Sequence, residues 1–343
     1  MNSVDDPGVS VVVTTAARLH LGFLDLNGAV GRRFGSIGVA LDSPTTRLRL
    51  ARAERQKLSG LQVERLATLL PRMQQRLGFD APVAVTVEAA IAAHSGLGSG
   101  TQLEMALAGG LAALAGLAAP AEQAMRLVDR GARSGIGMAS FLHGGFLIDG
   151  GHRIATEPVL DRDRPASPPP ILCRYDFPED WPFILIFDSN EQGLHGQSEA
   201  QAFTDLVPMN SGDTSRLAQL TLMGLMPGLV ERNFPAFASS LSEIQSIVGA
   251  YFAPAQNGSP YSSPRVALLM RKLPAAQLGI GQSSWGPTGF VLTESPAIAR
   301  ELSREIQSQI DRLSQTDPGY KNLSIQTVKA SNQGATIETT GKG

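Results

Sequence analysis

The stretch His94-Ser-Gly-Leu-Gly-Ser-Gly-Thr-Gln-Leu103 joins a β-rich segment to an apolar helix through a glycine-rich bend. Upstream of it, valines alternate with small or polar residues over 83–87, which is the period of a half-buried strand. Downstream, leucines recur at steps of four, four and three from Leu103 to Leu114, which places them on one face of a helix. The bend is therefore predicted to lie at the N-terminus of a helix.

A bend of this kind is a candidate phosphate cradle. Its three glycines can take positive φ and leave no Cβ in the way of an anion. The unpaired amides and the positive end of the helix dipole then favour phosphate or pyrophosphate. The candidate binding residues are Gly96, Leu97, Gly98, Ser99, Gly100, Thr101 and Gln102. A purely structural turn, capped by Ser99 or Thr101, is the alternative.

Two common phosphate-binding motifs are excluded by the residues present. A Walker loop needs Gly-Lys-Ser/Thr, and this chain has no lysine between Lys57 and Lys272. A Rossmann fingerprint needs the spacing GxGxxG, whereas the glycines here follow GxGxG. The bend thus belongs to neither of these two classes of nucleotide-binding loop.

Three ordered blocks resemble the galactokinase, homoserine kinase, mevalonate kinase and phosphomevalonate kinase (GHMP) superfamily. The central bend is similar to its second motif, the block RLHLGFLDLNG at 18–28 lies where its first motif would, and GIGQSSWGPTGF at 279–290 looks like its third. In the superfamily, the third motif is a glycine-rich loop that packs beside the phosphate loop. The resemblance implies a ribosomal S5 domain 2-like N-terminal half and a ferredoxin-like C-terminal half.

One position of the central loop departs from the kinases of that superfamily. Kinase members usually read GLGSS, and the second serine often helps to hold magnesium, whereas Gly100 has no ligand atom. Four segments resemble instead the β-ribofuranosylaminobenzene 5'-phosphate synthase family, namely 18–32, 96–104, 133–151 and 190–203. This resemblance covers roughly residues 9 to 330. It implies decarboxylating transfer of ribose 5-phosphate from phosphoribosyl pyrophosphate to 4-aminobenzoate, in methanopterin biosynthesis.

The elements expected in the first half of the chain point to an α+β fold. Strands are predicted at 9–17, 45–53, 82–91, 143–149 and 153–156, and helices at 62–77, 101–117 and 121–133. Four prolines within 161–170 exclude a helix or a central strand there, so this segment is predicted to be a linker. Residues 1–160 are then the N-terminal phosphate-binding domain.

The second half, residues 171–330, is predicted to be the C-terminal domain. Strands are expected at 171–177, 182–188, 288–294 and 323–329, with helices near 197–206, 214–231, 235–249, 263–272 and 296–314. That order is compatible with the ferredoxin-like half of the two-domain GHMP fold. The tail at 331–343 has little apolar content and is expected to be mobile.

Composition limits the partners and the compartment. With 343 residues, 43% of them hydrophobic, and a formal net charge of −2, this is a folded chain without the basic excess of a nucleic-acid binder. Arginine greatly outnumbers lysine, so contacts to phosphate fall mostly to bidentate guanidinium groups. The single cysteine, Cys173, fits a reducing cytoplasm, and the uncharged segment 105–121 is short for a membrane span. We therefore expect a cytoplasmic protein without membrane or nucleic-acid partners.

The reaction implied by the resemblance must stabilise positive charge at the ribose anomeric carbon. Asp25, just before an Asn-Gly turn, is the candidate carboxylate, with an Asx-type turn contact as the alternative. Arg32 is the candidate cation for the pyrophosphate or the substrate carboxylate. Arg18 and His20 come off one face of the first strand. Arg18 is a candidate phosphate contact, and His20 is a phosphate contact, a proton donor or a structural histidine.

The third block offers a second donor-rich loop. Its candidate binding residues are Gly281, Ser283, Ser284 and Trp285, the last either stacking on an aromatic substrate or packed in the core. Glu104, in the first helical turn, is a candidate ligand for a bridging Mg²⁺, or simply a favourable charge for the helix dipole. His195 with Glu199 could form a metal pair or a polar helix face, and Arg133 and His143 are further cleft candidates.

Three functions follow as hypotheses. The first is the decarboxylating phosphoribosyl transfer, which needs no organic cofactor and takes phosphoribosyl pyrophosphate with Mg²⁺. The second is an ATP-dependent GHMP small-molecule kinase, which Gly100 disfavours, and the third is a sugar-phosphate sensor without turnover. Residue patterns leave 4-aminobenzoate and 4-hydroxybenzoate open as the acceptor. A homodimer is an expectation from the family alone.

Overall fold

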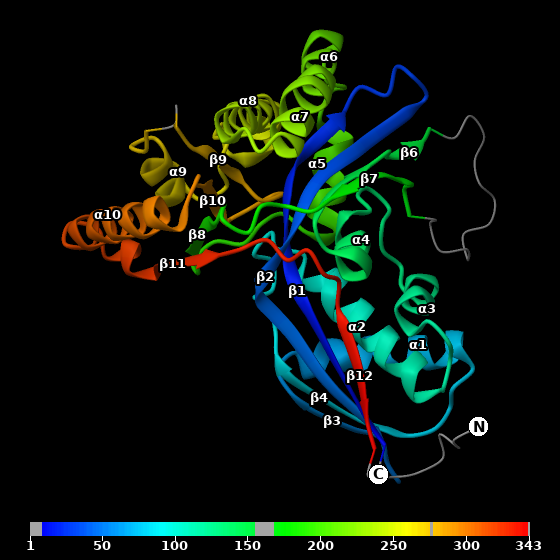
Figure 1. Ribbon diagram of the computed structural model, residues 1–343. Coiled ribbons are helices and arrows are strands. Elements are labelled where there is room, and N and C mark those ends of the chain that lie inside the picture. The colour runs from blue at the N-terminus through cyan, green and yellow to red at the C-terminus, as the bar shows by residue number, and fades with distance from the viewer. Residues whose placement is uncertain (1–8, 155–167, 275–276, 342–343) are drawn as a thin grey trace.

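The computed structural model describes residues 9–154, 168–274 and 277–341. Its larger sheet consists of β1 (Ser10–Asp25), β2 (Arg32–Arg52), β3 (Lys57–Gly60), β4 (Val83–Ala89), β5 (Phe146–Asp149), β6 (His152–Arg153), β7 (Ile171–Tyr175) and β12 (Thr336–Thr340). The order along the sheet is β12-β1-β2-β4-β3, with β5 and β6 beside β2 and β7 beside β5. β1 and β2 form a long antiparallel hairpin. Its turn, between Asp25 and Arg32, extends beyond α1, α2, α3 and α4 (Figure 1).

Helices cover one face of this sheet (Figure 1). They are α1 (Val63–Leu77), α2 (Ser99–Leu114), α3 (Pro120–Leu127) and α4 (Ile136–His143). Valines of β1 and β4 pack against the leucines of α2, as the alternation and the helical spacing predict. α2 is buried on nearly all sides because no charged residue follows Glu104 in it. The uncharged segment is thus a core helix.

The smaller sheet confirms the ferredoxin-like half. It contains β8 (Phe183–Asp188), β9 (Gly279–Gln282), β10 (Gly289–Leu292) and β11 (Leu323–Val328), in the order β11-β8-β10-β9. All neighbouring strands in it are antiparallel. Helices connect β8 to β9, which lie on either side of β10. α10 (Pro296–Ser314) connects β10 to β11, which lie on either side of β8. This connectivity is that of a ferredoxin-like domain.

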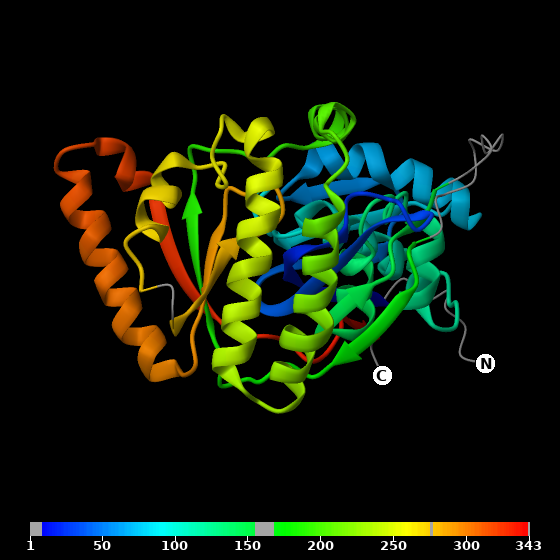
Figure 2. The ribbon, with the colours of Figure 1, turned by 90° about the horizontal axis from the view of Figure 1, so that it is seen from above.

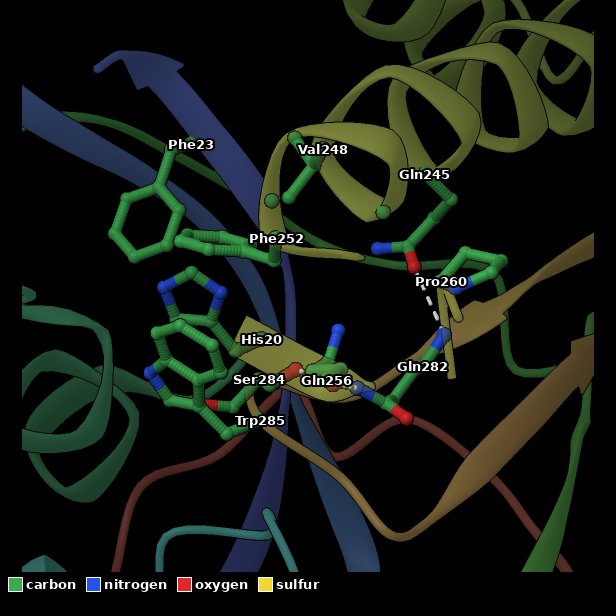
Figure 3. A pocket seen from close by; sticks show the side chains of 12 residues that line it. His20, Phe23, Gln245, Val248, Phe252, Gln256, Pro260, Gln282, Ser284 and Trp285 are labelled. Carbon is green, nitrogen blue, oxygen red and sulfur yellow. Dashed lines mark hydrogen bonds between the residues drawn. The ribbon is translucent and has the colours of Figure 1, made fainter. Parts of the chain in front are cut away.

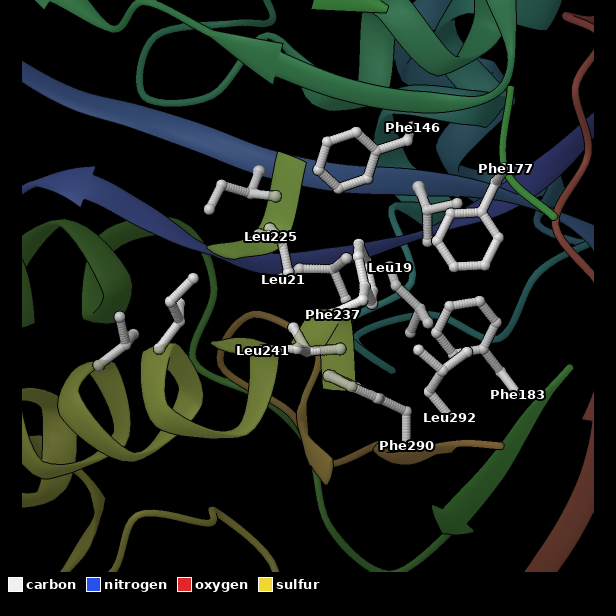
Figure 4. Close-up of a cluster of buried hydrophobic side chains, with 14 of the residues drawn as sticks. Leu19, Leu21, Phe146, Phe177, Phe183, Leu225, Phe237, Leu241, Phe290 and Leu292 are labelled. Carbon is white, nitrogen blue, oxygen red and sulfur yellow. The ribbon is translucent and has the colours of Figure 1, made fainter. Parts of the chain in front are cut away.

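Helices pack where the two sheets meet, without separating them completely (Figure 2). The remaining helical elements are α5 (Gly196–Asp205), α6 (Ser211–Leu220), a π-helical turn (Thr221–Leu225), α7 (Met226–Val230), α8 (Phe234–Phe252), α9 (Pro264–Met270) and the short 3₁₀ turns Ala253–Gln256 and Pro318–Asn322. Alternation along β8 decides which core each residue joins. Phe183 (Figure 4) and Leu185 pack with α8 and β1, whereas Ile184 and Ile186 pack with α9 and α10.

The C-terminal tail differs from what the sequence predicts, and most of the predicted linker lies outside the described residues. The expected mobile tail at 331–343 is wrong for the described residues, because β12 pairs with β1 from Ser10↔Thr340 to Thr14↔Thr336. Edge pairing satisfies backbone groups and needs little apolar content. Of the predicted linker, 161–167 lie outside the described residues. β7 and β12 follow that linker in sequence, yet both belong to the larger sheet.

Candidate functional site

The glycine-rich bend lies where the sequence predicts it, between β4 and the first turn of α2. Gly96 and Gly98 have φ of +80° and +82°, and Gly98 is the residue that caps α2. The first amides of the helix, from Ser99 onwards, have no carbonyl partner within the helix. The bend therefore presents backbone donors at the positive end of the helix dipole.

The third glycine-rich block packs against this bend, as the resemblance implies. Ser283 Oγ donates to the Gly96 carbonyl at 2.8 Å and accepts from the His20 amide at 3.1 Å. Thr288 Oγ1 donates to the Ser95 carbonyl at 2.7 Å. A Cβ at Gly96 would lie 2.4 Å from the Ser283 carbonyl oxygen, so only glycine permits this approach.

A hollow of about 380 Å³ opens in front of the bend. We call it the arginine hollow. It is lined by Arg18, Arg65, His94, Gly96, Gly98, Ser99, Gly100, Thr101, Arg130, Leu194, His195, Gly196, Glu199 and Ser284. Five of the expected loop residues and two from the other blocks, Arg18 and Ser284, are among them.

Arg18 connects the first block to the bend. Its Nη1 donates to the Gly96 carbonyl at 2.6 Å, and its backbone amide donates to the Leu97 carbonyl at 3.1 Å. Burial lowers the pKa of Arg18 to about 10, with Glu199 acting in the opposite direction. Arg18 therefore remains charged at neutral pH. Its Nε is buried without a hydrogen-bond partner among the described residues.

Arg65 and Arg130 were not predicted as site residues. Arg65 comes from the first turn of α1, and Arg130 from the segment after α3. Arg130 Nη2 donates to Glu104 Oε1, and Arg65 Nη2 lies 3.5 Å from the same oxygen. Burial lowers the pKa of Arg65, neighbouring Arg130 lowers it further, and Glu104 opposes both. No motif marks these two arginines, and the excess of arginine over lysine is their only trace in the sequence.

The residues around the bend do not fit a resident metal ion. Glu104, the expected Mg²⁺ ligand, directs its Oε1 to two guanidinium groups, and it is 6% exposed. Gly100 contributes no ligand atom. Over the described ranges, no group of three or more His, Cys, Asp or Glu side chains could hold a metal. In this structure Glu104 positions arginines.

Two expected loop residues face the core rather than the hollow. The Leu97 side chain is fully buried in the core between the sheets. Gln102 accepts from Thr15 Oγ1 at 2.5 Å and donates to the Gly137 carbonyl at 2.8 Å. Neither side chain therefore faces the hollow, because Leu97 packs into the core just before α2 and the first turn of α2 directs Gln102 inward.

Trp285 and His20 line a second, smaller cavity of about 20 Å³, which is room for a single water molecule (Figure 3). Trp285 is 5% exposed, and its ring centroid lies 4.4 Å from that of Phe252. The alternative of a tryptophan packed in the core is therefore correct. Gly281 lies within β9, where a Cβ would meet the Gln245 side chain at 2.2 Å. Gly281 thus lets the Gln245 side chain of α8 pack closely on β9.

His20 is a buried, neutral histidine. Its ring lies 4.6 Å from that of Phe23, and Figure 3 shows it among the rings of Phe23, Phe252 and Trp285. Burial lowers its pKa to about 3, and the charge of Arg18 acts in the same direction. His20 therefore cannot donate a proton as an imidazolium at neutral pH. Its Nε2 has no hydrogen-bond partner in the described structure.

Asp25 and Arg32 lie at the hairpin tip (residues 25–33), away from the hollow. Asp25 Oδ1 accepts the amides of Asn27 and Gly28, both at 2.7 Å, which is the Asx-type turn of the alternative hypothesis. Arg32 donates to the carbonyls of Gly150 at 2.8 Å and Gly151 at 2.7 Å. Helix α5 separates the two regions, because Gly196 lines the hollow and Met209, beyond the end of α5, bonds to the tip at Leu26. Its 10 residues span about 15 Å.

Two of the other candidates, His195 and Glu199, lie at the hollow, and His143 does not. His195 lines the hollow, and its ring stacks on that of His94 at 3.6 Å. Glu199 also lines the hollow and pairs with Arg133 at 2.9 Å, so the pair His195–Glu199 is not a metal site here. His143 is exposed and lies outside the hollow.

Two further sequence expectations concern Cys173 and the membrane. Cys173 is half-buried on β7, and burial raises its pKa. None of the helices in the described ranges combines the length and the hydropathy that crossing a bilayer requires.

Comparison with known proteins agrees with this geometry. Residues 63–145 match the GHMP kinases N terminal domain. Among solved structures, the Streptococcus pneumoniae phosphomevalonate kinase aligns with a TM-score of 0.63 and 12% identity over 94% of this chain and 100% of that one. A homoserine kinase from Cytophaga hutchinsonii aligns with a TM-score of 0.62 and 17% identity over 98% and 99%. These likenesses establish the GHMP fold.

Sequence relatives are more specific. A β-ribofuranosylphenol 5'-phosphate synthase from Methanothermobacter thermautotrophicus is 33% identical over 83% of this chain and 89% of its own length. The Archaeoglobus fulgidus protein of the same name is 32% identical over 94% of this chain and 98% of its own length. At this identity and coverage, the chain belongs to the β-ribofuranosylphenol 5'-phosphate synthase family.

Proposed function

We propose that this chain transfers ribose 5-phosphate from phosphoribosyl pyrophosphate to a para-substituted benzoate, releasing carbon dioxide and pyrophosphate, as a step of methanopterin biosynthesis in the cytoplasm. The observation that carries the proposal is the arginine hollow at the glycine-rich bend. It offers guanidinium groups and helix amides to a polyphosphate, but no metal-binding hydroxyl at position 100. A kinase of this fold has no comparable support.

The reaction balances without a redox partner or an added acid. The bond between C1 of the ribose and the pyrophosphate oxygen breaks, and its electron pair leaves with pyrophosphate. The ring carbon that bears the carboxylate attacks C1, since the electron-donating para substituent enriches that carbon. The carboxylate then leaves as carbon dioxide, and its bonding electrons restore the aromatic ring. Magnesium enters with phosphoribosyl pyrophosphate as part of the substrate.

We assign the steps of this reaction to residues of the hollow. Arg18, the amides at the start of α2, and Ser99, Thr101 and Ser284 face the space where the leaving pyrophosphate would lie. Glu199 is the carboxylate that lines the hollow, and it replaces Asp25 as our candidate for stabilising the oxocarbenium-like C1. Asp25 and Arg32 are proposed to shape the hairpin tip.

The acceptor ring carries either an amino or a hydroxyl group para to the carboxylate. The resemblance of the sequence implies 4-aminobenzoate, whereas the printed name of the relatives contains a phenol. Both substituents donate electrons into the ring, so the same mechanism serves both. The choice between them is a matter of relative kcat/KM.

The test is release of labelled carbon dioxide from carboxyl-labelled 4-aminobenzoate and 4-hydroxybenzoate, in parallel, with purified protein, Mg²⁺ and phosphoribosyl pyrophosphate. A third reaction replaces phosphoribosyl pyrophosphate with ATP. Release that requires phosphoribosyl pyrophosphate supports the proposal, and the ratio of the two rates identifies the acceptor. Absence of release from both acids would overturn it, and ligand binding without product would then indicate a sensor.

A further inference from the structure

We propose that Arg65 and Arg130, held over Gly100 by Glu104, form a guanidinium clamp that binds the pyrophosphate group directly, in place of a metal ion held by the protein. The proposal rests on the proposed function for the identity of the substrate and adds the way in which its pyrophosphate is held. The observation behind it is the mismatch between this site and a resident metal.

Gly100 determines where the clamp sits. A Cβ at this position would lie 2.6 Å from Arg65 Nη2 and 3.1 Å from Arg130 Nη2. The first distance is too short for a real Cβ and the second is tight, so the two guanidinium groups occupy the space that a larger residue would need. Gly100 takes an ordinary helical φ, as it is absent from the residues with positive φ. Its role here is to leave room, not to bend the chain.

Glu104 keeps the two cations together. The two guanidinium groups repel each other, and one carboxylate oxygen accepts from Arg130 and lies 3.5 Å from Arg65. The orientation of the forks is thus fixed before a ligand arrives, which lowers the cost of ordering them on binding. Glu104 acts as a positioning residue.

The excess of positive charge around the hollow favours binding of a polyanion. Arg18, Arg65 and Arg130 line it, and Arg133 pairs with Glu199, which also lines it. Glu104 and Glu199 are the carboxylates that line it or pair with its lining, so two positive charges remain uncompensated by these partners. The buried Nε of Arg18, which has no hydrogen-bond partner in the described residues, adds a donor that the fold leaves unused.

Pyrophosphate fits this arrangement better than a single phosphate does. Planar guanidinium forks match phosphate oxygens pairwise, and three of them approach from β1, α1 and the segment after α3. The amides at the start of α2 supply donors from a fourth direction. The hollow of about 380 Å³ has room for a diphosphate with its sugar.

The first experiment titrates inorganic pyrophosphate into the protein by calorimetry, with EDTA and separately with Mg²⁺. We expect binding in EDTA, and we expect Arg65→Lys and Arg130→Lys each to weaken it roughly 10-fold or more, because a lysine lacks the bidentate fork. Arg72→Lys is the matched control. Arg72 lies on α1 with Arg65 but is largely exposed and pairs with Asp129. This control should bind pyrophosphate like the wild type.

The second experiment uses two glycines in the same local setting. Gly100 and Gly212 are each the second residue of a helix and each follows a serine, but Gly212 lies on α6, outside the hollow. Alanine favours a helix over glycine, so both Gly100→Ala and Gly212→Ala should keep or raise the melting temperature. Gly100→Ala displaces flexible side-chain ends rather than backbone and should weaken pyrophosphate binding roughly 10-fold. Gly212→Ala should leave it unchanged.

These outcomes separate the clamp from the proposed function. If pyrophosphate binds only when Mg²⁺ is present, or if the Arg65, Arg130 and Gly100 variants bind it as well as the wild type, the clamp is wrong even when carbon dioxide is released. If pyrophosphate binds as described but no carbon dioxide is released from either acid, the clamp stands as a polyphosphate site and the proposed reaction fails.

Discussion

The two ends of α5 show what distinguishes a charged residue available for chemistry from one used by the fold. Beyond the C-terminus of α5, at the hairpin tip, Asp25 and Arg32 are bound to backbone amides and carbonyls. Before its N-terminus, at the arginine hollow, the guanidinium groups outnumber the carboxylates and face open space. Both regions are rich in glycine and arginine, so residue type alone does not tell them apart.

Asp149, in the turn next to the hairpin tip, is also a carboxylate bound to backbone amides. Asp149 is fully buried and accepts the amides of Ser36 at 3.1 Å, Gly135 at 2.8 Å and Gly151 at 2.9 Å. Burial raises its pKa, and these three bonds act in the opposite direction. Its acceptor capacity is used to hold three chain segments together. The polar groups of this region thus hold the hairpin together, whereas the arginines of the hollow line a cavity.

The largest expected effect tests this contrast with two identical substitutions. Arg18→Lys should lower kcat/KM for phosphoribosyl pyrophosphate about 100-fold, because it removes the planar group that bonds Gly96 and faces the hollow. Arg32→Lys should remain within about threefold of the wild type and lose only some stability, since it keeps a donor for one of its two carbonyls. Steady-state kinetics of both variants measures this. Equal losses would erase the distinction between the two regions.

A second pair compares the carboxylates. Glu199→Gln should lower kcat roughly 30-fold if the charge of Glu199 stabilises C1 of the ribose. Asp25→Asn should leave both folding and turnover close to wild type, because an amide oxygen still accepts the amides of Asn27 and Gly28. The sequence alone predicts a loss of about 100-fold for Asp25→Asn. Should that loss be observed without any loss for Glu199→Gln, the reacting carbon lies near the tip.

The fold was predictable to a large extent because its decisive patterns are local. Alternating valines and leucines at helical spacing each act over a few residues, and β4 and α2 follow from them. The ferredoxin-like half follows from the family resemblance, and β9 of its sheet was expected to be part of a glycine-rich loop. β12 was missed because its stability comes from pairing with β1, more than 300 residues away in sequence. Composition of the segment itself carries no trace of such a partner.

The site was predictable only where a motif encodes backbone geometry. The glycines of the bend are needed for their φ and for close approach, and both needs are visible in the sequence. Arg65 and Arg130 reach the hollow from α1 and from the segment after α3, so no spacing rule connects them to Gly100. Conversely, Trp285 and Gln102 lie inside conspicuous blocks, but packing directs them into the core.

A smaller expected effect is the loss of stability when Glu104, which holds the clamp together, is changed. Glu104→Gln removes the carboxylate between Arg65 and Arg130 and should lower the free energy of unfolding by about 1–2 kcal/mol, a modest value because both arginines are partly exposed. Added pyrophosphate should stabilise this variant less than the wild type, because the two guanidinium groups are no longer oriented before the anion binds. Thermal unfolding with and without 1 mM pyrophosphate measures it. An unchanged melting temperature would show that Glu104 does not hold the clamp.

The smallest effect concerns His20, which lies between the two regions. Unfolded His20 takes up a proton below about pH 6.5, whereas burial and Arg18 keep its folded-state pKa at about 3. The unfolded chain therefore binds more protons in this window, and His20 makes the protein less stable as the pH falls. Between pH 7 and pH 6 this amounts to about 0.7 kcal/mol. Urea titrations at the two pH values should show that His20→Gln loses this dependence and that His143→Gln, at an exposed histidine, retains it. Identical pH dependence in the wild type and His20→Gln would mean that the pKa of His20 is the same in the folded and unfolded chain, and it would restore His20 as a proton donor beside the hollow.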